Sequence, residues 1–300
     1  MSRRALPIVL LALLLAASPA YAAKSPKKAI WGPVEVDGES QFPIYKDLGA
    51  GVFQMKLQWD QTATVAPEDA SDPEDTAYDW PAEIDTAIDE GKRNGIKIAL
   101  TVVGTPGWAN GERAVTVAPT KPADLAGFLE AATQRYKDVR IWAIGDGAVS
   151  PAAKYPQLLD ASYAALHKAN KANKVIGGNG NKRLKLANGK AARMDYLGVD
   201  PSAKKALKKA KLASFEKTAG KHKLWLGPTK LYTSLNGPFR ITRSAQASWL
   251  TAAFRLIRSD KNVVALSYDG LLDELGAAQH GLIDADGDKK PAYNAFKRAR

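Results

Sequence analysis

Cysteine is absent from this chain of 300 residues. Its absence excludes disulfide bonds, thiolate metal sites, cysteine nucleophiles and a lipid-modified N-terminal cysteine. Histidine is scarce, and His167, His222 and His280 lack the spacing of metal ligands. No Gly-x-Ser-x-Gly sequence is present, which argues against a serine hydrolase. We therefore expect neither a metal ion nor a cofactor.

Long apolar runs are also lacking, except near the N-terminus. Arg3 and Arg4 precede an apolar run over residues 6–17, and Ala20-Tyr21-Ala22 follows. This order is typical of a cleaved signal peptide. We expect residues 1–23 to be the signal peptide and residues 24–300 the folded domain, secreted or in the cell envelope and without a membrane span. An uncleaved anchor is the alternative, but the run is shorter than the roughly 20 residues that span a bilayer.

Acidic residues are fewer than basic ones, 31 against 43, so the net charge is +12. The densest basic run contains Lys204, Lys205, Lys208 and Lys209, on a predicted helix over residues 202–219. A solvated helix face explains such a run, and attraction to an anionic polymer of the cell wall is the alternative. No zinc spacing or interleaved aromatic pattern indicates a nucleic-acid partner.

What the chain does contain is one alternation, repeated eight times, of a short apolar run, a polar loop and an amphipathic helix. The composition, 45% hydrophobic and 25% charged, is that of a globular protein. The runs predict strands at residues 29–33, 52–59, 97–103, 139–146, 174–179, 194–199, 223–227 and 262–269. Helical patterns cover residues 42–48, 80–94, 122–137, 155–169, 202–219, 241–258 and 291–300. Residues 181–190 read as a loop, so the fifth helix is reduced or missing.

This pattern predicts an α/β protein with a single (β/α)8 barrel. Runs such as residues 98–103 are apolar on both faces, as expected of a parallel sheet that is covered on both sides. An open doubly wound sheet is the alternative. That fold usually has a glycine-rich phosphate loop after its first strand, and residues 32–35 are not such a loop.

The ends of the predicted strands are rich in aromatic and acidic residues. Chemistry in a (β/α)8 barrel lies at this end of the strands, and flat aromatic faces pack well against sugar rings. We therefore predict a carbohydrate-binding rim, with tryptophans that simply plug the barrel mouth as the alternative. The predicted substrate-binding residues are Trp31, Trp59, Asp60, Trp108, Asn110, Asp200, Tyr232 and Tyr268.

Four stretches carry a resemblance to a known group of proteins. They are residues 28–33, Thr105-Pro106-Gly107-Trp108-Ala109, residues 139–145, and residues 281–287 with the following Lys290-Pro291-Ala292-Tyr293. The chain resembles secreted bacterial relatives of the clan A glycoside hydrolases, of the family 5 and family 39 kind, over essentially its whole mature length. The resemblance implies a (β/α)8 fold and a carbohydrate ligand.

The catalytic residues implied by the resemblance are missing. The acid/base glutamate expected after the fourth strand is replaced by Gly147, and the nucleophilic glutamate after the seventh strand by Pro228. Neither residue can attack a sugar or protonate a leaving group. Asp146 and Asp269 are the remaining, weaker catalytic candidates.

Three functions stay open at this point. The leading one is an exported barrel that binds a carbohydrate or a cell-wall glycopolymer without cleaving it. The second is an active glycoside hydrolase that uses relocated carboxylates such as Asp146 and Asp269. The third is a structural or envelope-interaction protein whose groove is vestigial. An open groove at the barrel mouth favours the first function over the third.

Overall fold

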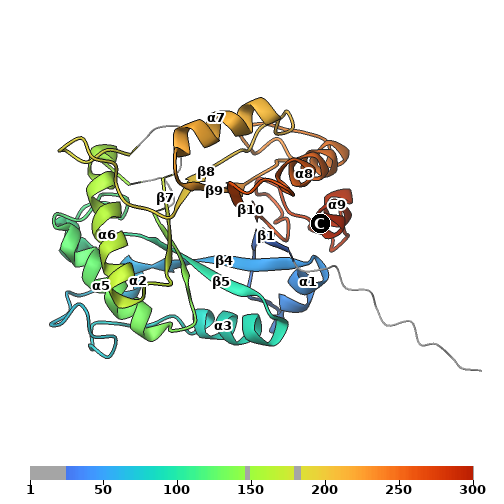
Figure 1. Ribbon diagram of the computed structural model, residues 1–300. Helices are drawn as coiled ribbons and strands as arrows, with labels where there is room; N and C mark the ends of the chain where they lie inside the picture. Colours follow the sequence, from blue (N-terminus) through green and yellow to red (C-terminus); the bar gives the residue numbers. More distant parts are fainter. Residues whose placement is uncertain (1–24, 146–148, 179–183, 300) are drawn as a thin grey trace, which may run out of the picture.

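A computed structural model describes residues 25–145, 149–178 and 184–299. Within these residues, eight parallel strands close into a barrel in the order β1-β10-β9-β8-β7-β6-β5-β4. Helices surround the barrel, and the chain runs around it once from β1 to β10 (Figure 1). The single (β/α)8 barrel that the sequence predicted is confirmed.

The barrel strands lie close to their predicted positions. They are β1 (Ser25–Trp31), β4 (Ala50–Gln58), β5 (Lys97–Val103), β6 (Ile141–Ile144), β7 (Lys174–Gly177), β8 (Tyr196–Val199), β9 (Lys223–Thr229) and β10 (Val263–Asp269). A small antiparallel pair, β2 (Glu35–Val36) and β3 (Glu39–Ser40), follows β1. The helices are α1 (Phe42–Asp47), α2 (Trp59–Thr62), α3 (Ala82–Asn94), α4 (Gly107–Asn110), α5 (Pro122–Arg135), the 3-10 turn η1 (Ala152–Lys154), α6 (Tyr155–Ala169), α7 (Lys209–Ala219), α8 (Arg243–Ile257) and α9 (Pro291–Arg298).

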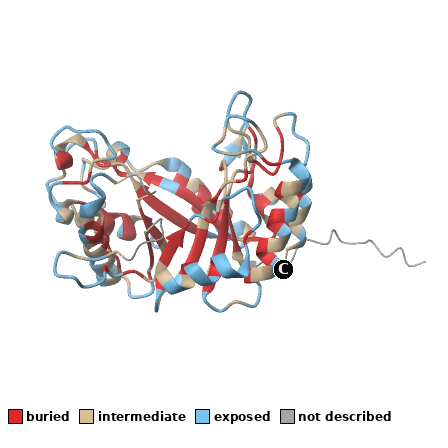
Figure 2. Cartoon of the chain, turned by 90° about the horizontal axis from the view of Figure 1, so that it is seen from above, coloured by how far each residue is buried: buried red, intermediate tan, exposed pale blue. Residues whose placement is uncertain are grey.

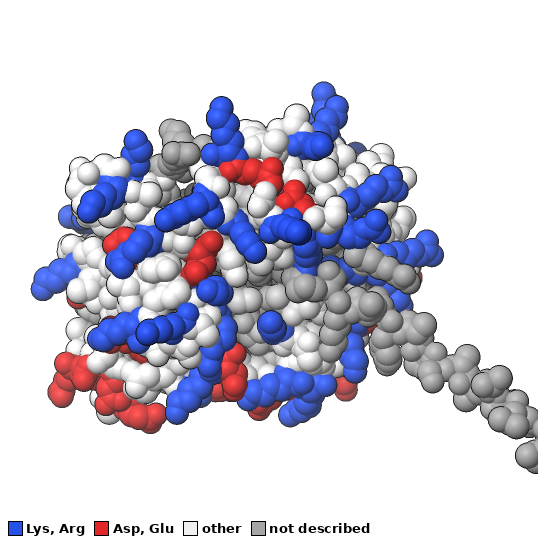
Figure 3. Space-filling view, viewed as in Figure 1, with Lys and Arg blue, Asp and Glu red and all other residues white. Residues whose placement is uncertain are grey.

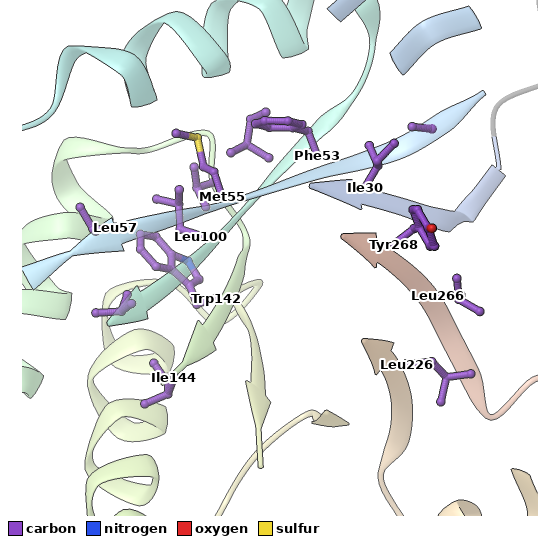
Figure 4. Packing of buried hydrophobic residues seen from close by; sticks show 14 of the residues in the cluster. Ile30, Phe53, Met55, Leu57, Leu100, Trp142, Ile144, Leu226, Leu266 and Tyr268 are labelled. Atoms are coloured by element: carbon purple, nitrogen blue, oxygen red, sulfur yellow. The ribbon is translucent and has the colours of Figure 1, made fainter. Parts of the chain in front are cut away.

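Alternate strand residues divide the core into two layers, because successive side chains of a strand point to opposite faces. Large side chains such as Phe53, Leu100 and Trp142 point outward and pack beneath the helices (Figure 4). Buried residues accordingly concentrate in the strands and on the inner sides of the helices (Figure 2). A second cluster fills the barrel itself with mostly smaller residues: Ala29, Val52, Ala99, Ala143, Ile176, Trp225 and Ala265.

The helix expected over residues 202–219 is shorter than predicted. The helix α7 begins at Lys209, and Lys204, Lys205 and Lys208 precede it as exposed residues outside any helix. Local bonds explain the late start. The Asp200 carboxylate accepts a hydrogen bond from the Ser202 backbone N–H at 2.8 Å, and the Lys205 carbonyl accepts one from the Trp249 indole at 3.0 Å. The described part of the connection between β7 and β8, residues 184–195, contains no helix, as predicted.

Helix α3 is held close to strand β5 by a glycine. Ile84, Ala87, Ile88 and Gly91 form its buried side. A Cβ atom on Gly91 would lie 2.7 Å from the Ile96 backbone oxygen and 2.9 Å from Ile98 Cδ1. The helix begins directly after Trp80 and Pro81, so its seat on β5 also positions these two residues at the barrel mouth.

We expect Gly91→Ala to lower the free energy of unfolding. Alanine in a helix interior normally gains up to about 1 kcal/mol over glycine, but overpacking a core costs about 1–3 kcal/mol, and the Ile96 carbonyl cannot rotate away as a side chain could. Ser214→Ala, at an exposed position of α7, is the control and should be neutral or slightly stabilising. Thermal and urea denaturation measure both variants. An unchanged or raised stability of Gly91→Ala would show that α3 can move away from β5.

Candidate functional site

A cavity of about 900 Å³ opens at the mouth of the barrel. Three tryptophans line it, namely Trp31, Trp80 and Trp225. Polar and charged side chains also line it, from β4, α2, the loop before α3, the start of α3, the residue after β9, and β10. They are Gln54, Lys56, Gln58, Gln61, Asp79, Glu83, Lys230 and Asp269. We call this space the mouth cavity. Its size and its mixture of aromatic and polar walls are typical of a site for a small organic ligand.

The mouth cavity reaches deep into the barrel because the strands that line it carry small residues there. Ala143, Gly145, Gly178, Gly198 and Gly227 all border the space and have at most a methyl side chain. The floor is the second core cluster, to which the larger Ile176 and Trp225 belong. The interior of this barrel is therefore filled in its lower half and left open in its upper half.

A chain of hydrogen bonds crosses the upper half of the barrel. The Trp31 indole Nε1 donates to Ser267 Oγ at 3.0 Å, and Ser267 Oγ donates to Gln54 Oε1 at 2.8 Å. Gln54 Nε2 in turn donates to Thr101 Oγ1 at 3.0 Å. Side chains from β1, β10, β4 and β5 are thus linked, and the orientation of the Trp31 ring is fixed before any ligand binds. Such preorganisation lowers the entropic cost of binding.

Asp269 is the most strongly held carboxylate of the mouth cavity. Its Oδ2 lies 3.2 Å from Lys230 Nζ, and its Oδ1 lies 3.6 Å from His280 Nε2. Burial alone raises the pKa of Asp269, but the hydrogen bond with His280 and the charge of Lys230 outweigh it, so the pKa lies below its ordinary value. Asp269 is consequently ionised at neutral pH. It can accept hydrogen bonds from ligand hydroxyls, but it is not poised to act as a general acid.

Pro228 borders the mouth cavity at the end of β9, where the resembling enzymes carry their nucleophile. Its side chain has no atom that could attack a sugar carbon. The acid/base position, Gly147, and the candidate Asp146 lie outside the described residues. Of the two weak catalytic candidates, the structure thus places only Asp269, and it places it in the cavity wall.

Trp59, Trp108 and Asp60 are not among the residues that line the mouth cavity. Trp59 is 2% exposed, stacks on Phe128 and meets Trp108 edge-on. The Trp108 indole donates to the Ala63 carbonyl at 2.8 Å. The Asp60 carboxylate lies against Gly104 and borders a smaller space of about 190 Å³ beside the mouth cavity. These residues therefore pack behind the wall of the mouth cavity. The rings of Trp59 and Trp108, which were predicted to contact a sugar, do not face the mouth cavity.

The other predicted binding residues also have structural partners. The buried Asn110 side chain donates to the Ala114 carbonyl at 3.1 Å, and the exposed Asp200 closes its local turn through Ser202. Tyr232 packs near His280, with ring centroids 5.4 Å apart. Tyr268 is fully buried, because it occupies the outward face of β10 while its neighbour Asp269 faces inward. Only Trp31 of the eight predicted binding residues lines the mouth cavity.

Several residues of the mouth cavity were not predicted as binding residues. Gln54, Lys56 and Gln58 recur at every second position of β4 and line the cavity together. That alternation of polar residues within an apolar strand is the sequence signal that could have identified them. Trp225 is also missed because it lies within its strand rather than at the end. Its buried Nε1 has no hydrogen-bond partner among the described residues.

In the part of the chain that the structure describes, no group of three or more His, Cys, Asp or Glu side chains is placed to hold a metal ion. No helix within the described ranges is both long and apolar enough to cross a membrane.

Comparison with known proteins identifies the fold. No protein-family model matches the chain, and no curated protein sequence matches it. Among solved structures, a family 39 glycoside hydrolase from Bacteroides cellulosilyticus WH2 is similar, with a TM-score of 0.67 and 14% identity over 91% of this chain and 63% of that one. The chain therefore spans less than two thirds of that enzyme's length.

Two more solved structures show the same relationship. A monomeric β-xylosidase from Caulobacter crescentus CB15 has a TM-score of 0.63 and 16% identity, over 93% of this chain and 68% of that chain. Xylanase 10B from Thermotoga maritima has a TM-score of 0.60 and 13% identity, over 91% of this chain and 93% of that chain. The chain thus has the barrel fold of these glycoside hydrolases, as the sequence motifs predicted.

We expect Lys230→Met to raise the pKa of Asp269. Without the ammonium group, the effect of burial on Asp269 is opposed mainly by His280. In the wild type, the ionised carboxylate stabilises the fold above the unfolded pKa of about 3.9, and this stabilisation is lost as the pH falls through the lower folded pKa. In the variant, the loss should begin at higher pH.

A ¹³C NMR titration of the Asp269 carboxyl measures this pKa directly. Lys204→Met is the control, since Lys204 is exposed and does not line the mouth cavity. Identical titration curves for the wild type and Lys230→Met would contradict the assigned role of Lys230.

Proposed function

We propose that this chain is a glycosidase-like barrel that binds a carbohydrate or a cell-wall glycopolymer in its mouth cavity without cleaving it. The observation that carries the proposal is a tryptophan-lined cavity of about 900 Å³ in which a proline, Pro228, occupies the end of β9. The similar structures are named as a glycoside hydrolase, a β-xylosidase and a xylanase, which supports a sugar as the ligand.

The binding half of the proposal rests on the chemistry of the cavity wall. A sugar presents apolar C–H faces and a belt of hydroxyl groups. The partly exposed Trp31 and Trp80 offer aromatic surface above the buried Trp225 of the floor. Gln58 and Gln61 offer amides, and Asp269 offers an ionised carboxylate. A few placed polar groups within aromatic walls are what a specific sugar site requires.

The non-catalytic half rests on the two replaced glutamates. Retaining hydrolysis needs a nucleophile and an acid/base group about 5–5.5 Å apart. Pro228 supplies no nucleophile, and Gly147, by its residue type, supplies no acid. An active hydrolase with relocated carboxylates is the second candidate, favoured only by the ionised Asp269 in the cavity wall. We further propose export through the N-terminal signal peptide, with a mature chain that begins at Ala23 or Lys24.

Trp31→Ala should weaken sugar binding about fivefold or more. Loss of one stacked aromatic ring removes on the order of 1 kcal/mol or more, and each 1.4 kcal/mol corresponds to about a tenfold change in Kd. Trp31→Phe keeps an aromatic face but loses the bond to Ser267 and should have an intermediate effect. Titration calorimetry with xylobiose, neutral oligosaccharides and cell-wall fragments measures the affinities.

Trp108→Ala is the matched control, because Trp108 lies outside the mouth cavity and bonds to Ala63. It should bind like the wild type once folding has been checked by circular dichroism. Equal affinities for the wild type and Trp31→Ala, or no sugar binding at all, would leave the groove vestigial and favour the third function, an envelope-interaction protein.

Hydrolysis of glycosides should remain near the uncatalysed background. General acid–base catalysis alone contributes about 10²–10⁴-fold, and covalent catalysis is lost in addition. Release of 4-nitrophenol from aryl glycosides and of reducing ends from oligosaccharides measures the rate. A clear turnover that Asp269→Asn abolishes and Asp200→Asn preserves would support the hydrolase with relocated carboxylates.

A further inference from the structure

The end of the barrel opposite the mouth has a second large cavity, of about 840 Å³. The starts of strands β1, β7, β8, β9 and β10 border it, together with the turns that precede β9 and β10. We call it the basal basin. Six basic residues line it, namely Lys27, Lys174, Lys221, Lys223, Arg258 and Lys261. The acidic residues that line it are Asp195 and Asp260.

The barrel geometry gathers these charges from distant parts of the sequence. Lys27, Lys174 and Lys223 stand near or at the start of parallel strands, an even number of residues before the inward-facing Ala29, Ile176 and Trp225. Alternation therefore turns all three toward the barrel axis, at the same end. The lysines between positions 204 and 211, in contrast, are close together in the sequence. None of them lines the mouth cavity or the basal basin, and Lys209 borders a separate cavity beside α7.

The acidic residues of the basal basin do not neutralise it. Asp195 is shared by Lys174, whose Nζ lies 3.3 Å from Oδ1, and by His167, whose Nε2 lies 2.9 Å from Oδ2. Asp260 contributes its backbone oxygen to Lys27, and its carboxylate accepts the Asn262 backbone N–H at 2.8 Å. Among the described residues, Lys221, Lys223, Arg258 and Lys261 form no ion pair. All four are exposed.

The basic groups are close enough to influence one another. Burial lowers the pKa of Lys27, and the charge of Lys223 lowers it further. The carboxylate of Asp260 has the opposite effect. The charge of the exposed Lys223 therefore reaches the partly buried Lys27 across the basin. Solubility requires a charged surface, but it does not require cations to converge on a cavity.

We propose that the basal basin is a second ligand site, which binds a polymer carrying repeated carboxylate or phosphate groups. A small anion would fill little of its volume, whereas a polymer can neutralise several of the separate cations at once. Catalytic and substrate residues of (β/α)8 barrels lie at the opposite end, so this site would anchor the protein while the mouth cavity stays free.

The net charge of +12 and the charges on one face of the molecule support an anionic partner. On the face drawn in Figure 3, lysine and arginine side chains are spread over the whole width, and the largest acidic group lies at the lower-left edge. That edge corresponds to the loop between α2 and α3, near the mouth (Figure 1). A polyanion would therefore be repelled near this loop and attracted to the basal basin.

A triple variant tests the proposal. Lys221→Gln, Lys223→Gln and Lys261→Gln are combined in the full chain and compared with a control that combines Lys204→Gln, Lys208→Gln and Lys217→Gln. All six lysines are exposed, and both triples remove three charges. Binding of polygalacturonate and of inorganic polyphosphate is measured by calorimetry at several salt concentrations, with neutral dextran and monomeric galacturonate and phosphate alongside.

The basin triple should weaken binding of at least one polyanion about tenfold or more and reduce the salt dependence, since fewer counterions are released. The control triple should change the affinity less than about twofold. The polymer that binds more tightly distinguishes carboxylate from phosphate. An equal loss of affinity in the two triple variants would show that net charge alone causes the effect, and it would overturn the proposal. A wild-type protein that binds neither polymer would also overturn it. Trp31→Ala should bind polyanions like the wild type, which separates this site from the mouth cavity.

Discussion

Half of all strand positions in this protein point into a closed barrel, and each inward side chain must either pack against its neighbours or leave space that a solvent or ligand molecule can enter. In the lower half, the inward side chains pack against one another. Most of them are small and apolar, and Ile176 and Trp225 are the larger members of this floor. In the upper half, alanine and glycine on β6 to β9 cannot fill the same width, and a cavity of about 900 Å³ remains. In this open half, side-chain hydrogen bonds that run from Trp31 through Ser267 and Gln54 to Thr101 link the strands in place of apolar packing. The cavity is thus a direct consequence of which residues stand at inward positions.

A glycosidase-like barrel does not by itself provide the side chains that cleave a sugar. The barrel, its open mouth and a tryptophan-bearing wall are all present, and the similar solved structures share the fold at 13–16% identity. Catalysis depends on two additional side chains at the ends of β6 and β9, and Pro228 stands at the second of these ends. Asp269, from β10, places a negative charge in the cavity, but Lys230 and His280 keep it ionised. Such a carboxylate suits recognition of hydroxyl groups better than protonation of a leaving oxygen.

Periodicity predicted the fold well, whereas the site was predicted only in part. The eight apolar runs fall on the eight barrel strands, since a strand buried on both faces has a simple sequence pattern. Binding residues were sought at strand ends, where Trp31 and Asp269 do lie. Trp59 and Tyr268 also stand at strand ends, but a shift of one position turns a side chain from the cavity to the packed outer face. Gln54, Lys56 and Trp225 lie within strands, and which cavity they border depends on the register of all eight strands.

The basal basin depends on that register too. Lys27 and Lys223 are separated by nearly 200 residues in the sequence, and they meet Lys174 only in the closed barrel.

The function proposed above requires the mouth cavity to hold an intact sugar beside Trp31 and Asp269. This can be observed in a crystal structure of the protein soaked with an oligosaccharide that binds in solution. We expect density for an uncleaved, non-covalently bound sugar in the mouth cavity, with a ring against the Trp31 indole and a hydroxyl within hydrogen-bond distance of the Asp269 carboxylate. A sugar bound only outside the mouth cavity, a cleaved product, or a glycosyl group bonded to the protein would contradict non-catalytic binding in the mouth cavity.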